Sequence, residues 1–286
     1  MRVAIQPDRL DGFLAHLHYS TVLAASVALV AVVFLGAIFA PLAPHDPAIM
    51  NATTRLQGPS LSHWLGTDQF GRDVFARVLY GSRTSLQVAL VAVGTAVVAG
   101  GLIGLVTGYL GGWVDAAVMR VMDVMISFPA LLLALFLVAV LGPSLTNLII
   151  AISLTRVPYF ARLTRAEAMA IRVRPYITAA RAMGGSHAWI MLRHVVPNVI
   201  PILIIFGTTD LAGAIIAESA LSYLGLGAQP PTPSWGRMLT ESRAFVGQAP
   251  WLVIFPGLFV MVTVIAVNMT GDGLRDFLDP SLNNRR

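Results

Sequence analysis

Two acidic residues stand inside long apolar stretches, where carboxylates are rare and usually mark a functional site. Asp210 lies near the centre of residues 199–221, and Glu218 follows about two helical turns later. Their spacing of eight residues predicts that both side chains lie on roughly one face of a helix. We expect this face, with Ser222 beyond it, to form a translocation path or gate, or to contact a neighbouring subunit. For Asp210, a structural hydrogen bond to another helix is an equal alternative.

The other residue types form no catalytic or metal-binding constellation. The chain has no cysteine, which excludes thiolate chemistry and disulfides. All 19 basic residues are arginine, so the lysine of a G-x-x-x-x-G-K-[ST] phosphate-binding loop is missing. The six histidines form no H-E-x-x-H helix, and we predict neither a metal site nor a bound cofactor. The arginines are spread over many segments, which argues against nucleic-acid binding.

The apolar residues lie in long blocks that are typical of membrane helices. Hydrophobic residues make up 56% of the 286 residues and charged residues 12%, about half the charged fraction of a soluble domain. We therefore predict an all-α, polytopic membrane protein with six transmembrane helices. They lie near residues 21–40, 86–109, 122–141, 145–162, 199–221 and 250–270. The fourth and fifth carry Arg156 and Asp210, so we expect them to need neighbouring helices for insertion.

The distribution of arginine predicts how the chain is oriented. The transmembrane domain is predicted over residues 21–270, between an N-terminal segment, 1–20, and a tail, 271–286. Thirteen arginines fall on the side that holds both ends of the chain, and six fall on the opposite side. Because cytoplasmic loops are enriched in arginine, both termini are predicted to be cytoplasmic.

Three segments between the spans are long enough to have a function of their own. They are an external segment at 41–85, a cytoplasmic loop at 163–197 and an external loop at 222–249. In the first, Asp73 and Arg77 have the spacing of a helical ion pair, and an apolar stripe around them predicts a helix on the outer membrane surface. This helix is either a structural strap or a contact for an external partner. Prolines in the third segment favour a stiff, extended loop, with Trp235 at the level of the lipid head groups.

The cytoplasmic loop predicts two short helices around a glycine break. Pro175 suits the first turn of one helix, and Gly184-Gly185 suits its end. Ser186 is predicted to cap a second helix, which Pro197 stops. Such an elbow can dock into another protein as a rigid lever. The alternative is an ordinary basic loop that anionic lipid head groups hold.

A glycine stripe predicts that one membrane helix packs very closely against another. Gly100-x-x-x-Gly104-x-x-x-Gly108 lines one face of the predicted second span. Small residues at this spacing let two backbones approach each other. The sequence leaves open whether the partner helix belongs to the same subunit.

The elbow also carries a family resemblance. Thr178-Ala179-Ala180-x-x-x-Gly184, followed by Pro197, resembles the EAA loop of binding-protein-dependent ABC importer permeases, although Thr178 stands where glutamate is usual. Four further stretches are similar to the dipeptide/oligopeptide (DppC/OppC) type of this family. They lie at residues 63–73, 108–123, 218–236 and 271–280. The resemblance covers roughly residues 60–280.

The resemblance implies a type I ABC importer permease fold in the plasma (inner) membrane of a prokaryote, surrounded by membrane lipid. It implies a second homologous permease, two ATPase subunits or domains that use ATP and Mg²⁺, and an extracytoplasmic peptide-binding protein. This chain itself is then no enzyme. The ATPase-coupling residues would be Tyr176, Thr178, Ala179, Ala180, Arg181, Ala182, Met183, Gly184, Ser186 and Pro197. The external partner would meet Asp68, Arg72, Asp73, Pro231 and Trp235.

Peptide import is the predicted function, and other functions remain as alternatives. The same architecture serves importers of nickel chelates, glutathione or antimicrobial peptides. A proton-coupled secondary transporter would use Asp210 as a relay and would show internal inverted repeats, of which the sequence gives no sign. A membrane-embedded hydrolase would need a paired nucleophile and base, and no such pair is evident.

Overall fold

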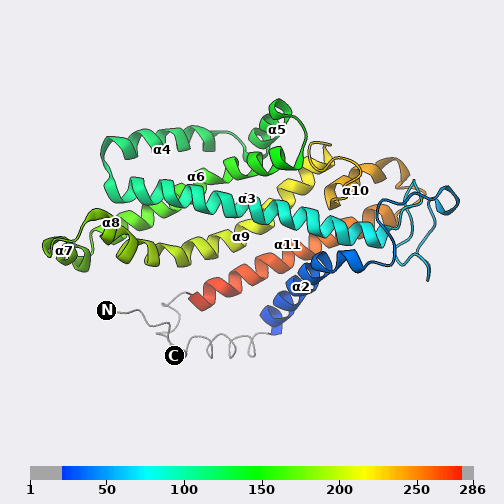
Figure 1. The fold of residues 1–286 in the computed structure, drawn as a ribbon, viewed down its shortest axis with the longest axis horizontal. Helices are drawn as coiled ribbons and strands as arrows, with labels where there is room; N and C mark the ends of the chain where they lie inside the picture. Colours follow the sequence, from blue (N-terminus) through cyan, green and yellow to red (C-terminus); the bar gives the residue numbers. More distant parts are fainter. Residues whose placement is uncertain (1–20, 279–286) are drawn as a thin grey trace.

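The computed structural model describes residues 21–278, and helices dominate them (Figure 1). Within these residues the prediction of an all-α protein is confirmed. The α-helices are α2 (Thr21–Ile38), α3 (Val74–Leu110), α4 (Gly112–Ser127), α5 (Ala130–Leu141), α6 (Leu145–Arg172), α7 (Pro175–Ala182), α8 (His187–Ile190), α9 (Val196–Tyr223), α10 (Trp235–Ser242) and α11 (Trp251–Leu278). Shorter helical turns are η1 (Ala40–Leu42), η2 (Ala52–Thr54), the π-helical η3 (Met191–Val195) and η4 (Arg243–Phe245). The predicted segment 1–20 and residues 279–286 of the predicted tail lie outside the described residues.

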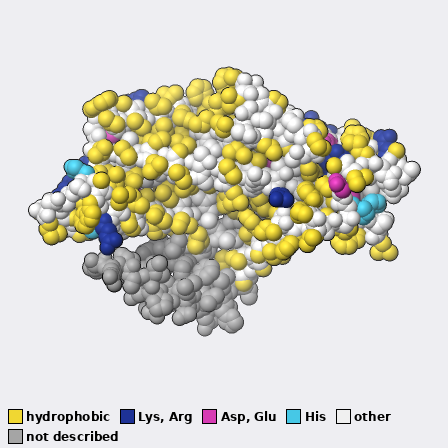
Figure 2. All heavy atoms as spheres, viewed as in Figure 1, with side chains coloured by type: hydrophobic (Ala, Val, Ile, Leu, Met, Phe, Trp, Pro, Cys, Tyr) yellow, Lys and Arg dark blue, Asp and Glu magenta, His cyan; other side chains and the backbone are white. Residues whose placement is uncertain are grey.

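Four long helices, α3, α6, α9 and α11, run along the long axis of the molecule (Figure 1). Helices α7 and α8 lie together at one end, and the segment between α2 and α3 lies at the other. Hydrophobic side chains cover most of the middle of the face shown in Figure 2, and most of the charged side chains visible on it lie near the two ends. This distribution suits a bundle whose middle lies in lipid.

Three helices are long and apolar enough to cross a membrane. They are α3, the continuous helix His187–Tyr223, and α11 over Trp251–Asp276. Helices α4 and α5 together would be a fourth, if the bent pair counts as one span. Helix α2 is shorter, and α6 has the length but carries several charged residues. Length and composition thus support three or four spans among residues 21–278, where the sequence predicts six.

The predicted third span is not one straight helix. Helices α4 and α5 meet at an angle of 92°, and α5 lies across the long axis (Figure 1). The cause is Pro129, because a proline pushes the preceding residue out of the helical region. Phe128 accordingly has an extended backbone, with φ −90° and ψ 138°. The sequence pattern did not predict this break, because the apolar run is long enough for one complete span.

The predicted helix on the outer membrane surface is also wrong. Residues 74–79 form the first turns of α3, which continues unbroken for 37 residues, or about 55 Å, and so exceeds the roughly 30 Å hydrocarbon core. Val74 and Val78 are buried against α10 and α11 rather than lying on lipid. Asp73 caps this helix through the Ala76 N–H and does not pair with Arg77.

The glycine stripe packs within this chain, against α6. A Cβ atom on Gly100, Gly104 or Gly108 would collide with α6 backbone atoms of Val157, Ala161 and Arg165, respectively. Glycine at these three positions therefore sets the separation of α3 and α6, the most extensive helix contact among the described residues.

Two arginine side chains of α6 form ion pairs with acidic residues of α4. Arg165 makes a bidentate ion pair with Asp115, with distances of 2.5 and 2.6 Å, and Arg162 pairs with Asp123 at 2.5 Å. Both acids belong to the stretch 108–123 that resembles the importer permeases. The structure therefore gives this stretch a structural role, because it fixes α4 beside α6.

Replacing Gly104 with alanine should destabilise the fold. The added methyl group collides with backbone atoms of α6, which cannot rotate away, and overpacking of this kind costs about 1–3 kcal/mol. We expect a lower thermal unfolding midpoint in detergent, measured by tryptophan fluorescence. Gly94→Ala is the matched control on the same helix, since a Cβ at Gly94 meets nothing within 4 Å. Equal midpoints for the two variants would contradict the close contact.

Candidate functional site

The cytoplasmic loop forms the predicted elbow, defined here as residues 175–197. Helix α7 starts with Pro175 in its first turn, and Gly184 follows it with a φ of +84°, a conformation that favours glycine. Ser186 then caps α8 by accepting a hydrogen bond from the Trp189 N–H at 3.3 Å. The two helices and the break between them occur where the sequence predicts them.

Pro197 does not stop the second helix, and this prediction is wrong. The chain continues from α8 through the π-helical turn η3 into α9 without leaving the helical form. A π-helical turn already departs from the regular i→i−4 hydrogen bonding, and Pro197 falls in the first turn of α9, where a missing N–H is tolerated. The elbow is therefore continuous with α9.

A separate apolar cluster, here called the elbow core, holds the elbow against three long helices. Its members are buried and come from α3, α6, α7, α8, η3 and α9. They are Leu105, Tyr109, Ala168, Ile171, Ile177, Ala180, Ile190, Val195 and Val199. Ile177 and Ile190 are fully buried, and each fixes one of the two elbow helices. The elbow is thereby fixed to α3, α6 and α9 together.

Polar contacts at Tyr109 add a second connection between α3 and the elbow. The Tyr109 hydroxyl lies 3.3 Å from Nδ1 of His187, and the Arg181 guanidinium lies over its ring, 5.6 Å from the centroid. Arg172 donates a hydrogen bond of 3.0 Å to the Tyr109 carbonyl oxygen. Residues of α6, α7 and α8 thus converge on the last turn of α3.

The outer face of the elbow presents most of the residues predicted to couple to an ATPase. Tyr176, Thr178, Ala179, Arg181, Ala182, Met183, Gly184, Ser186 and Pro197 are exposed, whereas Ala180 is buried in the elbow core. Met183 exposes 80% of its surface at the end of α7, and Trp189 exposes 49% on α8. Exposed apolar groups rimmed by polar ones are typical of protein interaction sites.

Asp210 faces an arginine from the preceding long helix. Nε of Arg156 lies 2.8 Å from Oδ2 of Asp210, and neither atom has a well-aligned hydrogen-bond partner among the described residues. The pair borders a cavity of about 450 Å³ whose wall includes Tyr159, Phe160 and Phe206. The two charges thus stand together at the wall of an open cavity between α6 and α9.

Glu218 does not share this face, contrary to the sequence prediction. It is completely buried, and it accepts hydrogen bonds from Ser222 at 2.7 Å and Ser219 at 3.4 Å. Ser222 is likewise fully buried. Eight residues correspond to about 2.2 turns of helix, so Glu218 is rotated by about 80° from Asp210. Glu218 and Ser222 therefore belong to the interior of the chain, next to α10.

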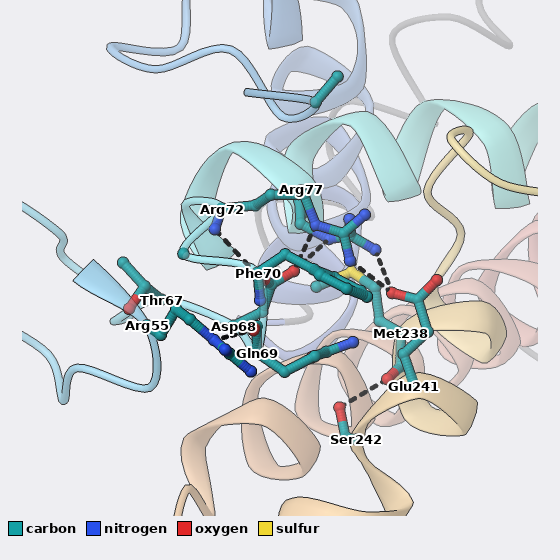
Figure 3. Close-up of polar contacts among 12 residues, drawn as sticks. Arg55, Thr67, Asp68, Gln69, Phe70, Arg72, Arg77, Met238, Glu241 and Ser242 are labelled. Carbon is teal, nitrogen blue, oxygen red and sulfur yellow. Dashed lines mark hydrogen bonds and ion pairs between the residues drawn. The ribbon is translucent and has the colours of Figure 1, made fainter. Parts of the chain in front are cut away.

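Charged residues from both predicted external segments form one cluster (Figure 3). Arg72 and Arg77 each donate a 2.8 Å hydrogen bond to Oε2 of Glu241 on α10, and Arg237 donates to Oε1 at 3.0 Å. Asp68 accepts from Arg72 at 2.6 Å. Burial alone would raise the pKa of Glu241, but the guanidinium groups of Arg77, Arg237 and Arg72 outweigh it and hold this pKa below its ordinary value.

Most residues predicted to meet an external partner are buried in this part of the chain. Asp68, Arg72 and Asp73 are each at most 4% exposed, and Trp235 is fully buried and donates to the Val78 carbonyl at 3.2 Å. Trp235 therefore does not lie at the head-group level, and it begins helix α10 where an extended loop is predicted. Only Pro231 remains exposed. Buried ion pairs explain why these polar residues do not face outward.

Sequence reasoning missed a group of side chains beside this cluster. His45 and His63 both approach Asp73, although the three residues stand far apart in the sequence. No regular spacing signals this arrangement, because irregular segments carry both histidines. Only the folded path of residues 43–73 brings them to the start of α3.

Replacing Glu241 with glutamine should destabilise the external end at neutral pH. The change leaves two buried arginines without their shared carboxylate, and breaking such a pair costs on the order of 3 kcal/mol. Because the folded-state pKa is lowered, the stabilisation is present above the ordinary carboxyl pKa of about 4.3 and is lost as the pH falls below it. The thermal midpoints of wild type and Glu241→Gln should therefore differ most near pH 7 and converge at low pH.

Asp46→Asn is the control for this comparison, because Asp46 is exposed in the segment between α2 and α3 and forms no ion pair with the described residues. Its midpoint should follow that of the wild type at each pH. A constant difference between wild type and Glu241→Gln across the acid range would contradict the assigned charge of Glu241.

Comparison with known proteins agrees with this architecture. Residues 100–284 match the family described as the binding-protein-dependent transport system inner membrane component. The dipeptide transport system permease protein of Alkalihalophilus pseudofirmus is 48% identical over 87% of this chain and 82% of its own length. The glutathione transport system permease protein of Pectobacterium atrosepticum is 42% identical over 85% of this chain and 81% of its own length.

The fold has a counterpart among solved structures. An inward-facing structure of the MetNI methionine ABC transporter matches 70% of this chain and 95% of its own, with a TM-score of 0.55 and 19% identity. That likeness supports the type I importer permease fold. The family match and the identity over most of the chain lead to one conclusion: the protein belongs to the inner membrane components of binding-protein-dependent transport systems.

Proposed function

We propose that this chain is a permease subunit of an ATP-binding-cassette importer that moves di- and oligopeptides across the plasma membrane. The observation that carries the proposal is the elbow, an exposed two-helix projection whose buried side is fixed to three long helices. Relatives at 42–48% identity are named as dipeptide and glutathione permeases, and both cargoes are peptides.

The partners of this subunit follow from the same proposal. A second homologous permease completes the pathway, and two ATPase subunits bind below it and use ATP and Mg²⁺. An extracytoplasmic binding protein delivers the peptide. The exposed outer face of the elbow supports ATPase docking, since Met183 and Tyr176 offer apolar groups to a partner. ATP hydrolysis is assigned to these partners and not to this chain.

The proposed arrangement in the membrane has six crossings, with both termini in the cytoplasm. The excess of arginine on the side of the elbow supports this orientation. Helix α6 counts as a crossing because three of its four arginines have acidic partners on neighbouring helices, which lowers the cost of burying them. Helix α2 counts because it packs along α11.

The mechanism we propose is mechanical. Closure of the ATPases moves the elbow, and the elbow core passes the movement to α3, α6 and α9. Arg156 on α6 and Asp210 on α9 line one cavity. The same movement therefore changes the shape of that cavity. Access then alternates between the two sides of the membrane.

The Arg156–Asp210 pair suits a peptide cargo in particular. A free peptide has an α-carboxylate at one end and an α-ammonium group at the other. Arg156 and Asp210 provide the complementary charges, and their side chains, which are 11% and 33% exposed, line the cavity between α6 and α9. We infer that these two groups contact the termini of passing peptides.

Glutathione is the second candidate cargo, because relatives at 42–44% identity are named for it. A proton-coupled transporter receives less support, since it needs no docking elbow and belongs to no binding-protein-dependent family. Uptake of labelled dipeptides and of glutathione by the reconstituted transporter distinguishes the two peptide cargoes.

A single cysteine at position 182 should trap the ATPase subunit. The chain has no cysteine of its own, and Ala182 is exposed on the elbow. With a bifunctional reagent that joins the thiol to a lysine amine of the ATPase, we expect Ala182→Cys to form a crosslink that changes with bound nucleotide, as detected by gel mobility. Ala180→Cys is the matched control, because Ala180 lies two residues away and is only 4% exposed. Absence of an Ala182→Cys crosslink under every nucleotide condition would remove the docking role.

Neutralising Asp210 should reduce peptide uptake while the subunits still assemble. Loss of a charged hydrogen bond to the cargo costs about 1.5–3 kcal/mol, which corresponds to roughly 10–150-fold lower uptake for Asp210→Asn. The double variant Arg156→Gln/Asp210→Asn separates two explanations. If the pair only stabilises the helices, removing both charges restores uptake; if it binds peptide termini, uptake stays low. Measured uptake in proteoliposomes therefore decides the role of the pair.

A further inference from the structure

A cluster of three side chains at the end of the molecule opposite the elbow has the composition of a metal site. We name it the histidine cluster, and it consists of His45, His63 and Asp73. One ligand atom from each residue lies within 4.8 Å of the other two. The cluster takes no part in the proposed transport mechanism, and the following inference does not rest on that proposal.

In both histidines the Nδ1 atom points toward the same carboxylate oxygen, Oδ2 of Asp73. Nδ1 of His63 lies 2.8 Å from Oδ2 of Asp73, and Nδ1 of His45 lies 3.6 Å from the same atom. The two imidazole rings are themselves neighbours, with centroids 4.8 Å apart. An ordinary hydrogen bond accounts for the position of His63 but gives no reason for His45 to converge on the same oxygen.

The carboxylate of Asp73 is held in place by its other oxygen. Oδ1 accepts a hydrogen bond of 2.8 Å from the Ala76 N–H, which makes Asp73 the N-cap of α3. The side chain is only 3% exposed, so it has little freedom to turn. Because one oxygen is fixed in this way, the other is oriented toward the histidines. In known metal sites, hydrogen bonds from neighbouring groups orient the metal ligands in the same manner.

The loop that carries His63 is fixed as well. The Ser60 hydroxyl accepts a hydrogen bond of 3.1 Å from the His63 N–H, and the His63 carbonyl accepts from the N–H groups of Ser60 and Gly66. The His63 side chain is 15% exposed and that of His45 is 42% exposed. Two of the three ligands are therefore preorganised, and the third lies at the surface, where an ion enters.

We propose that His45, His63 and Asp73 bind a divalent first-row transition-metal ion, with Zn²⁺ the best fit. Two imidazole nitrogens and one carboxylate oxygen are ligands that Zn²⁺ accepts, whereas Mg²⁺ and Ca²⁺ prefer oxygen alone. Bonds of about 2.0–2.2 Å in tetrahedral geometry separate the ligand atoms by about 3.3 Å. The separations of 2.8 and 3.6 Å lie on either side of that value.

A fourth ligand position is available to water. A cavity of about 280 Å³ adjoins the cluster, and His45, Ser62 and Asp73 line it together with Trp64 and Phe75. A bound ion would join the segment that follows α2, the loop around His63 and the first residue before α3. It would thus hold the external end of the bundle in one conformation.

The test is a Zn²⁺ titration of the full-length chain in lipid nanodiscs, purified with an affinity tag that contains no histidine. Asp73→Asn and His63→Gln are the decisive variants, because asparagine still caps a helix and glutamine can still donate to Asp73. His45→Ala is a third variant that changes an exposed side chain. His187→Gln is the matched control at the opposite end of the molecule, and Mg²⁺ is the control ion.

We expect the wild type and His187→Gln to bind one Zn²⁺ per chain at low micromolar concentration and to gain thermal stability with it. The three cluster variants should bind at least about tenfold more weakly, since even residues behind a metal ligand change affinity by 10–100-fold. Co²⁺ should give visible absorption bands in the wild type that disappear in Asp73→Asn. Equal Zn²⁺ binding by all variants, or no binding by the folded wild type, would overturn the proposal.

Discussion

The fold depends on how helix α6 is accommodated, because three of its four arginines, Arg156, Arg162 and Arg165, enter a bundle of apolar helices. Each of these arginines has an acid from a neighbouring helix as its partner: Asp210 on α9, and Asp123 and Asp115 on α4. At Arg156, which is only 11% exposed, loss of the acidic partner would cost several kcal/mol. On its other side α6 meets the glycine stripe of α3, where backbone approaches backbone. Pairing and close packing together place α6 between α3, α4 and α9.

The position of α6 in turn determines what the elbow can move. Helix α6 leads directly into α7, and α8 leads through a π-helical turn into α9, so the elbow lies between two helices that border the Arg156–Asp210 cavity. The elbow core adds α3 to this unit through Leu105 and Tyr109. Continuous helices and buried contacts therefore join the exposed face of the elbow to the cavity.

Sequence reasoning predicted local features well and long-range contacts poorly. The elbow, with Gly184 and the Ser186 cap, depends on residues adjacent in the chain, and it was predictable for that reason. The fully buried Glu218 and the inward-facing Asp68 and Arg72 depend on which helices become neighbours. The bend at Pro129 is a local feature, and it was missed because the length of the apolar run was given more weight than the proline within it. Hydropathy alone also gives weak evidence for α6 as a span, because its arginines are tolerated only through acidic partners on other helices. The same limitation hid the approach of His45 and His63 to Asp73.

The central claim is that the elbow moves α3, α6 and α9 as one unit because the elbow core joins them. The most direct measurement is peptide uptake per ATP hydrolysed in proteoliposomes, compared between wild type and Ile177→Ala/Ile190→Ala. These substitutions loosen the elbow core but leave the exposed outer face of the elbow unchanged. We predict that ATP hydrolysis continues and that uptake per ATP falls several-fold. Unchanged uptake per ATP in the folded, assembled variant would contradict the account.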